Sequence, residues 1–115
     1  MTLPNAHKAL VDRVKLEEYL LSFEHPQGRG KALFFARFGY WRSNWEALRD
    51  AFLAQAATAD AVELPANGFG RKFAVEGPLA TPSGRTPIVR AIWFLPEGGE
   101  APTFATAFPG KEDRR

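Results

Sequence analysis

The sequence predicts an α+β fold in which about three N-terminal helices pack on a three- to four-stranded antiparallel sheet. Up to about residue 57, apolar residues recur every three or four positions, as they do on the buried face of a helix. From about residue 61, short apolar segments alternate with turns rich in proline and glycine. A chain of 115 residues is the size of one domain. We therefore expect residues 1–115 to form a single domain with a frayed tail at 110–115.

Two helices are expected in the first forty residues. Asp12 is a suitable N-cap for a helix over about residues 13–22, which carries one apolar stripe. A short helix over about residues 31–38 has apolar side chains around nearly its whole circumference, which indicates burial between other elements. Gly39 is placed to end this helix, because glycine readily adopts the left-handed conformation found after many helices.

A third helix is expected from Ser43 to about residue 57. The segment Ser43-Asn44-Trp45-Glu46 fits a capping box, in which a serine hydroxyl and a glutamate carboxylate each accept from an unpaired amide. Trp45, Leu48 and Phe52 then fall on one face of the helix. This face is expected to be buried.

Four strands are expected in the second half of the chain, at residues 61–64, 70–79, 87–95 and 103–108. Alternation in the third places Val89 and Trp93 on one face and Arg90 and Ile92 on the other. Both faces are largely apolar, which indicates a central strand covered on both sides. Arg90 must find a partner or line a cleft. An ion pair with Glu76 on a neighbouring strand and recognition of a phosphate are both open.

Composition excludes several classes of function. The chain has no cysteine, so disulfides, thiolate metal sites and a cysteine nucleophile are excluded. It has no H-E-x-x-H or similar spacing of metal ligands, so we expect no metal and no cofactor. It has no signal-peptide pattern, and no segment approaches the roughly 18 apolar residues of a membrane helix. We expect a cytoplasmic protein without membrane attachment.

The basic residues are unevenly distributed, although the net charge is only +2. Residues 29–42 hold four basic side chains and no acidic one, and residues 71–90 hold four basic side chains and one acidic one. An ordinary mixed surface is one explanation. The other is that both segments meet in one anion-binding face. In that case the residues that contact phosphate or RNA are Arg29, Arg71, Arg85 and Arg90.

The loop over residues 24–31 concentrates the candidate chemistry. It holds His25, Arg29 and Lys31 at the start of a helix, where exposed amides favour anions. An imidazole titrates near neutrality and can act as a general acid or base. A flexible connector with a surface histidine is the alternative. Thr106 near the end of the chain is either a β-former in an edge strand or a ligand of the same phosphate.

Two stretches together resemble a small bacterial family of unknown function. Residues 20–35, with Gly39 following, are similar to its signature L-N-P-x-H-P-x-G-x-x-K-A-x-x-F…G, and Thr106-Ala107-Phe108-Pro109 resembles its closing T-A-Y-P. Residues 70–73 and 84–93 add further similarity. Ser22-Phe23 in place of Asn-Pro and Phe108 in place of Tyr are departures, and the second questions the need for a tyrosine hydroxyl there.

That family in turn resembles the toxin ribonucleases grouped as barnase–EndoU–colicin–RelE-like, which place helices before a four-stranded antiparallel sheet and work without metal. The resemblance implies a metal-independent endoribonuclease toxin with RNA as substrate and a cognate antitoxin or immunity protein as partner. In it, His25 assists removal of the 2′-hydroxyl proton. Lys31, with Arg29 or Arg90, stabilises the phosphorane charge, and Thr106 orients a phosphate oxygen.

Two other hypotheses remain open. One is a non-catalytic binding module, such as an immunity or antitoxin partner or a mobile-element accessory protein. The other is a homo-oligomer built through the last strand, whose free edge must be managed.

Overall fold

A computed structural model describes residues 1–66 and 68–110 of the chain. Its helical elements are η1 (Ala6–Lys8), α1 (Arg13–Lys15), the π-helical turn η2 (Leu16–Leu20), α2 (Arg29–Ala36), η3 (Arg42–Asn44) and α3 (Trp45–Thr58). Its strands are β1 (Ala61–Leu64), β2 (Gly70–Pro78), β3 (Ile88–Pro96) and β4 (Thr103–Pro109). The predicted α+β class is therefore confirmed, with the strands in the C-terminal half. Most of the tail expected to be frayed, residues 111–115, lies outside the described residues.

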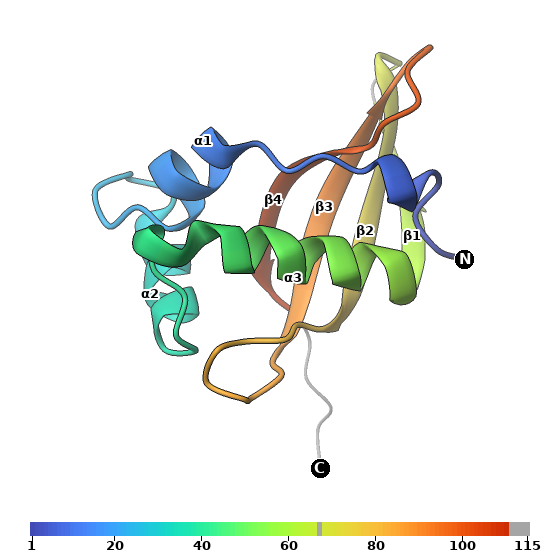
Figure 1. Ribbon diagram of the computed structural model, residues 1–115. Coiled ribbons are helices and arrows are strands. Elements are labelled where there is room, and N and C mark those ends of the chain that lie inside the picture. Colours follow the sequence, from blue (N-terminus) through green and yellow to red (C-terminus); the bar gives the residue numbers. More distant parts are fainter. Residues whose placement is uncertain (67, 111–115) are drawn as a thin grey trace.

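The strands form one antiparallel sheet in the order β1-β2-β3-β4. Figure 1 shows α3 crossing one face of this sheet, with α1 and α2 gathered near the β4 side. None of the helices in residues 1–66 and 68–110 has the length and hydrophobicity that a membrane span requires.

Aromatic side chains fill the space between α3 and the sheet. Phe52 of α3 stacks against Phe104 of β4 with ring centroids 4.7 Å apart, and Phe104 meets Trp93 edge-on at 5.7 Å. Phe52 and Trp93 are fully buried. The amide of Gln55 lies in the same core, where it donates to the carbonyls of Gly77 and Val89 at 3.0 and 2.9 Å. This core holds β2, β3 and β4 against α3.

The sheet has one covered face and one open face. Along β3, Val89, Ala91, Trp93 and Leu95 are buried, whereas Ile88, Arg90, Ile92 and Phe94 are only half-buried. The expectation that both faces are covered was therefore wrong, because the helices pack on one face only (Figure 1). We call the side that carries Arg90 and Ile92 the open face.

The helix ends follow local signals in two cases out of three. The Asp12 carboxylate accepts from the Val14 amide at 2.9 Å, and Gly39 has a φ of 95°, as predicted for both. The capping box at Ser43 was wrong. Instead, the side-chain oxygen of Asn44 accepts from the Trp41 amide at 2.7 Å, and Ser43 lies inside the 3-10 turn η3 that precedes α3.

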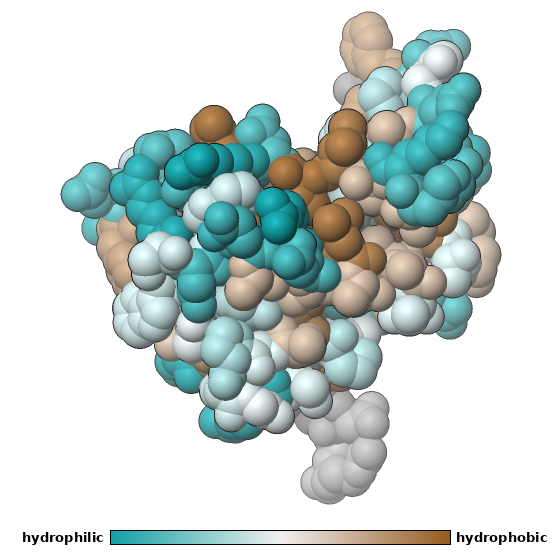
Figure 2. Space-filling view, viewed as in Figure 1, coloured by the Kyte–Doolittle hydropathy of each residue, from teal (hydrophilic) through white to brown (hydrophobic). Residues whose placement is uncertain are grey.

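The free edge of β4 is partly occupied by the N-terminal segment. The Leu10 amide donates to the Pro102 carbonyl at 2.9 Å, and the Phe104 amide donates to the Leu10 carbonyl at 2.9 Å. Figure 2 shows hydrophobic residues gathered where this segment crosses the sheet. An oligomer built through the last strand would therefore have only the rest of this edge, and the oligomeric state stays a prediction.

Because of Tyr40, we expect the folded protein to lose stability in strong alkali. Burial, with a smaller contribution from the charge of Asp50, raises the pKa of Tyr40 to about 12. Its hydroxyl donates to the Ala80 carbonyl at 2.6 Å. Because the folded pKa lies above the unfolded one, this stability is fully present below about pH 10 and is lost as the pH rises towards 12. Urea unfolding at several alkaline pH values should show a shallower loss in Tyr40→Phe. An equal loss of unfolding free energy with rising pH in wild type and in Tyr40→Phe would contradict the prediction.

Candidate functional site

Three side chains from three distant parts of the chain meet at the edge of β4. The ammonium of Lys31 in α2 donates to the hydroxyl of Tyr19 at 2.7 Å and to the hydroxyl of Thr106 at 2.8 Å. The two hydroxyl oxygens are 3.0 Å apart and share a hydrogen bond. We call Tyr19, Lys31 and Thr106 the hydroxyl–lysine triangle.

An irregularity in β4 orients the Thr106 side chain towards Lys31 and Tyr19. Trp93 pairs with Phe104, but Ile92 pairs with Thr106, so Ala105 is an extra residue in β4. Phe104 faces the core, and without the extra residue simple alternation would turn Thr106 the same way. The bulge instead places Thr106 on the open face with Ile92. Lys31 reaches it from α2, whose buried residues Ala32 and Phe35 anchor the helix.

The triangle has two protons to spare. An ammonium group has three donors, and Lys31 uses two of them on the hydroxyls. The hydroxyls of Tyr19 and Thr106 hold two protons, of which their mutual hydrogen bond uses one. Within the described residues, one ammonium proton and one hydroxyl proton therefore remain for a ligand. Chemically, these two protons can be donated to an oxygen-bearing anion.

Lys31 carries a half-buried positive charge with no carboxylate partner in residues 1–66 and 68–110. Aromatic rings flank it instead: its nitrogen lies 5.2 Å from the ring centre of Tyr19 and 5.6 Å from that of Phe108. These contacts compensate a cation only in part. A charge left partly compensated is more typical of a functional site than of a structural one.

Lys31 also changes the acidity of Tyr19. Burial alone raises the pKa of the Tyr19 phenol, but hydrogen bonds from Lys31 and Thr106 and the positive charges of Lys31 and Lys15 outweigh it. The net result is a pKa below the ordinary value for tyrosine. The phenol of Tyr19 therefore gives up its proton more readily than an ordinary tyrosine does.

His25 lies beside Tyr19 with its ring nitrogen Nδ1 already used. The amides of Gln27 and Gly28 donate to Nδ1 at 3.0 and 3.2 Å. These contacts assign the proton of the neutral imidazole to Nε2, because Nδ1 must accept. The His25 ring meets the Tyr19 ring edge-on, with centroids 5.0 Å apart. In this arrangement His25 offers a donor rather than a base.

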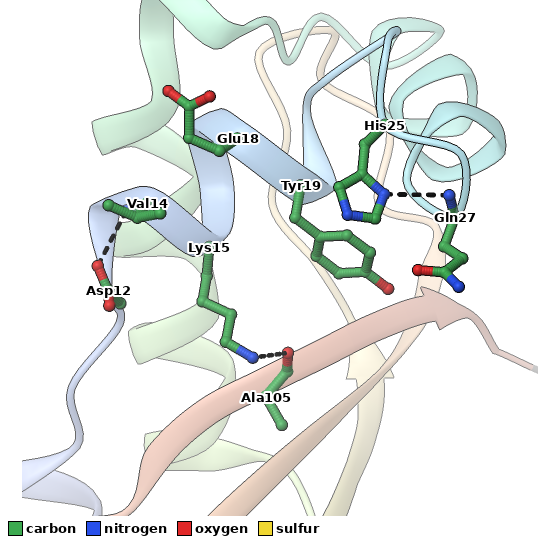
Figure 3. A pocket seen from close by; sticks show the side chains of 8 residues that line it. All are labelled: Asp12, Val14, Lys15, Glu18, Tyr19, His25, Gln27 and Ala105. Atoms are coloured by element: carbon green, nitrogen blue, oxygen red, sulfur yellow. Dashed lines mark hydrogen bonds between the residues drawn. The ribbon is translucent and has the colours of Figure 1, made fainter.

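A hollow of about 540 Å³ opens along the Tyr19 and His25 side chains. Figure 3 shows its walls, with Val14, Lys15 and Glu18 from α1 and η2 on one side and Gln27 on the other. The Lys15 ammonium donates to the Ala105 carbonyl at 3.2 Å and so ties α1 to the bulge of β4. The hollow adjoins the triangle, because Tyr19 lines the hollow and is also a member of the triangle.

The structure brings together His25, Lys31 and Thr106, but two of the four predicted arginines are paired with acidic residues elsewhere. Arg71 forms a two-point ion pair with Glu63, at 3.0 and 2.9 Å. Arg90 pairs with Glu76 at 3.3 Å, which is the structural alternative left open above.

The other two predicted arginines differ from each other. The Arg85 guanidinium lies 5.3 Å from the ring centre of Phe38, so the two basic segments do touch there. Arg29 is exposed at the first residue of α2. Among the described residues, no three His, Asp or Glu side chains gather as a metal site would need.

Comparison with known proteins places the chain in a family. The model of the domain of unknown function DUF6883 matches residues 2–111. The chain belongs to this family of unknown function. The prediction of a domain of unknown function is thus confirmed, while the signature motif predicted for it and its link to ribonucleases stay predictions. No curated protein matches this DUF6883 domain.

The DUF6883 domain shares its fold with a chain in a solved structure. It is described as a contact-dependent growth inhibition toxin–immunity protein complex from Klebsiella pneumoniae 342. The TM-score is 0.72 at 16% sequence identity, and the match covers 93% of the DUF6883 domain and 97% of the other chain. At this identity the likeness establishes a common fold.

Sequence reasoning missed Tyr19 as a site residue. It placed Tyr19 on the apolar stripe of the first helix, because its spacing fits that stripe. The π-helical turn η2 leaves Tyr19 half-buried, with its hydroxyl within reach of β4. No signal in the sequence indicates that turn.

Proposed function

We propose that this DUF6883 domain is a toxin that cleaves RNA in the cytoplasm without a metal ion. The observation that carries the proposal is the hydroxyl–lysine triangle, a partly compensated cation with two spare protons beside a titratable phenol. The fold is shared with a chain of a toxin–immunity protein complex, which is compatible with a toxin and equally with an immunity protein.

In this proposal the phosphate of the scissile bond sits on the triangle. The spare proton of Lys31 and the hydroxyl proton of Thr106 each donate to a phosphate oxygen, while the ionised Tyr19 accepts from Lys31. Arg29, exposed at the start of α2 two residues before Lys31, adds positive charge to the same end of the helix. These donors stabilise the extra charge that develops on the pentavalent phosphorus.

Tyr19 rather than His25 moves the proton. The ribose 2′-hydroxyl attacks phosphorus, a bond forms between O2′ and phosphorus, and the bond between phosphorus and O5′ breaks. The ionised Tyr19 takes the 2′-hydroxyl proton, and the departing 5′-oxygen takes a proton from water. His25 donates from Nε2 to a phosphate oxygen, since the Gln27 and Gly28 amides occupy Nδ1.

Replacing Tyr19 by phenylalanine should lower the cleavage rate by about 10²–10⁴-fold, the usual contribution of a general base. Because the pKa of Tyr19 is lowered, the wild-type rate should rise with pH and reach half of its maximum below the ordinary pKa of tyrosine, about 10. The Phe variant should lack this rise. Both profiles come from a fluorogenic RNA substrate after subtraction of the rate without protein. A wild-type rate that falls over the same range would make Tyr19 the proton donor instead.

Tightly induced expression tests the proposed function directly. Wild type should arrest bacterial growth, and the His25→Ala, Lys31→Ala double variant should not. RNA from arrested cells should show new ends, and the purified protein should produce the same ends in the presence of EDTA. Harmless expression of wild type together with no RNA cleavage in vitro would refute the proposal.

A non-catalytic binding module is the second candidate, and one surface feature favours it. Phe23 and Trp41 are 43% and 49% exposed, and their ring centroids lie 6.2 Å apart. Exposed aromatic residues are enriched in protein interfaces. On this reading the partner is a cognate immunity or antitoxin protein. Harmless overexpression and co-purification of one protein, lost in Trp41→Ala, would support it.

A further inference from the structure

We propose that the open face of the sheet beside Lys31 binds an unpaired nucleotide, whose base stacks on Phe108 while its phosphate contacts Lys31 and Thr106. This inference rests on the proposed cleavage of RNA and specifies the form of the substrate. It assigns a function to the open face, which the described helices leave free (Figure 1).

Strand register places the side chains of Glu76, Arg90 and Phe108 in one row across the sheet. Arg90 of β3 pairs with Glu76 of β2 and with Phe108 of β4. Residues paired in this way share a face, with their Cβ atoms about 4.5–5.5 Å apart. The adjacent row holds Ile92 and Thr106. Phe108 therefore has Thr106 next to it on the same face of β4 and Arg90 beside it on β3.

The positive charge of this surface lies at one end. Lys31 is 2.8 Å from the Thr106 hydroxyl and 5.6 Å from the centre of the Phe108 ring, and it keeps one free proton. Arg90 at the other side of Phe108 is paired with Glu76, and each of the two side chains is about one third exposed. The pair is neutral overall. A phosphate is therefore drawn to Lys31 and not to Arg90.

The chemistry next to the phosphate site suits a nucleobase. Phe108 is half-buried and supplies a flat aromatic ring, and Ile92 adds apolar surface beside it. Every base has a π-face, so stacking on an aromatic ring holds the nucleotide without selecting its sequence. The Arg90–Glu76 pair beyond the ring offers both donors and acceptors to the edge of a base. A base within a duplex has no free face, so the ligand must be single-stranded.

The test measures binding of a fluorescent 2′-O-methyl RNA hexanucleotide, which cannot be cleaved because its 2′-oxygens are blocked. Phe108→Ala should weaken binding about 5- to 100-fold, the usual range for one stacked base. Phe108→Leu keeps the bulk but not the flat ring and should weaken it similarly, whereas Phe108→Tyr should stay close to wild type. Phe94→Ala is the matched control, because Phe94 lies on the same face but farther from Lys31.

Competition with inorganic phosphate distinguishes the contribution of the base to binding from that of the phosphate. With the proteins compared at equal occupancy, inorganic phosphate should displace the hexanucleotide from wild type and from Phe108→Leu at similar phosphate concentrations. It should displace the hexanucleotide only weakly from Lys31→Ala. Annealing the hexanucleotide to its complement should weaken binding to wild type. Full binding by Phe108→Leu, or equal binding of single strand and duplex, would overturn the inference while leaving the proposed cleavage intact. No hexanucleotide binding by wild type would refute both.

Discussion

Replacing Lys31 by alanine is expected to lower the rate of RNA cleavage by about 10²–10³-fold, the usual cost of removing one donor that stabilises transition-state charge. Lys31 supplies the positive charge of the triangle and orients both hydroxyls, at 2.7 and 2.8 Å. The variant also loses the interaction that lowers the pKa of Tyr19. The rate is measured with a short single-stranded RNA at saturating protein.

Stability distinguishes this effect from a simple loss of structure. Lys31 has no carboxylate partner among the described residues, and relief of its charge burial offsets the loss of its two hydrogen bonds, so its removal should change the melting temperature little. Arg37→Ala is the matched control, because it removes one positive charge from an exposed site at the other end of α2. Wild-type cleavage by Lys31→Ala, or an equal loss in Arg37→Ala, would contradict the assignment.

Replacing Gly28 by alanine is expected to destabilise the protein by about 1–3 kcal/mol, the usual cost of overpacking, and to disrupt the site. A Cβ atom at Gly28 would lie 1.9 Å from the Tyr19 carbonyl oxygen. The loop that carries His25 must therefore move away from Tyr19, and α2 with Lys31 begins at the next residue. Urea unfolding measures the loss, and hexanucleotide binding measures the damage to the site.

Gly30 provides the control for that change. It lies two residues farther along, in the first turn of α2, and a Cβ atom there meets nothing within 4 Å. Gly30→Ala should stabilise the helix by roughly 0.5–1 kcal/mol, because glycine has a higher conformational entropy cost in a helix. Equal destabilisation by both substitutions would show that the close approach to Tyr19 is not the reason.

The candidate site was predicted in part from one local segment. His25 and Lys31 were identified because basic and glycine residues cluster ahead of a helix, and Thr106 because of a resemblance at the chain end. The role expected of His25 depended on which ring nitrogen is free, and only the amides of Gln27 and Gly28 decide that. Arg71 and Arg90 pair with acidic residues on adjacent strands, and whether such pairs form depends on strand register.

The order of helices and strands, most of their boundaries and the division of the β3 side chains between two faces followed from the sequence, whereas which of these faces the helices cover did not. These features depend on residues within a few positions of one another, such as the Asp12 cap and the alternation along β3. The tertiary structure alone decided the site. Tyr19 and Thr106 are 87 positions apart, and they meet only because a π-helical turn and a bulge in β4 redirect both side chains. Each irregularity is stabilised by packing between distant segments, so no local pattern encodes it.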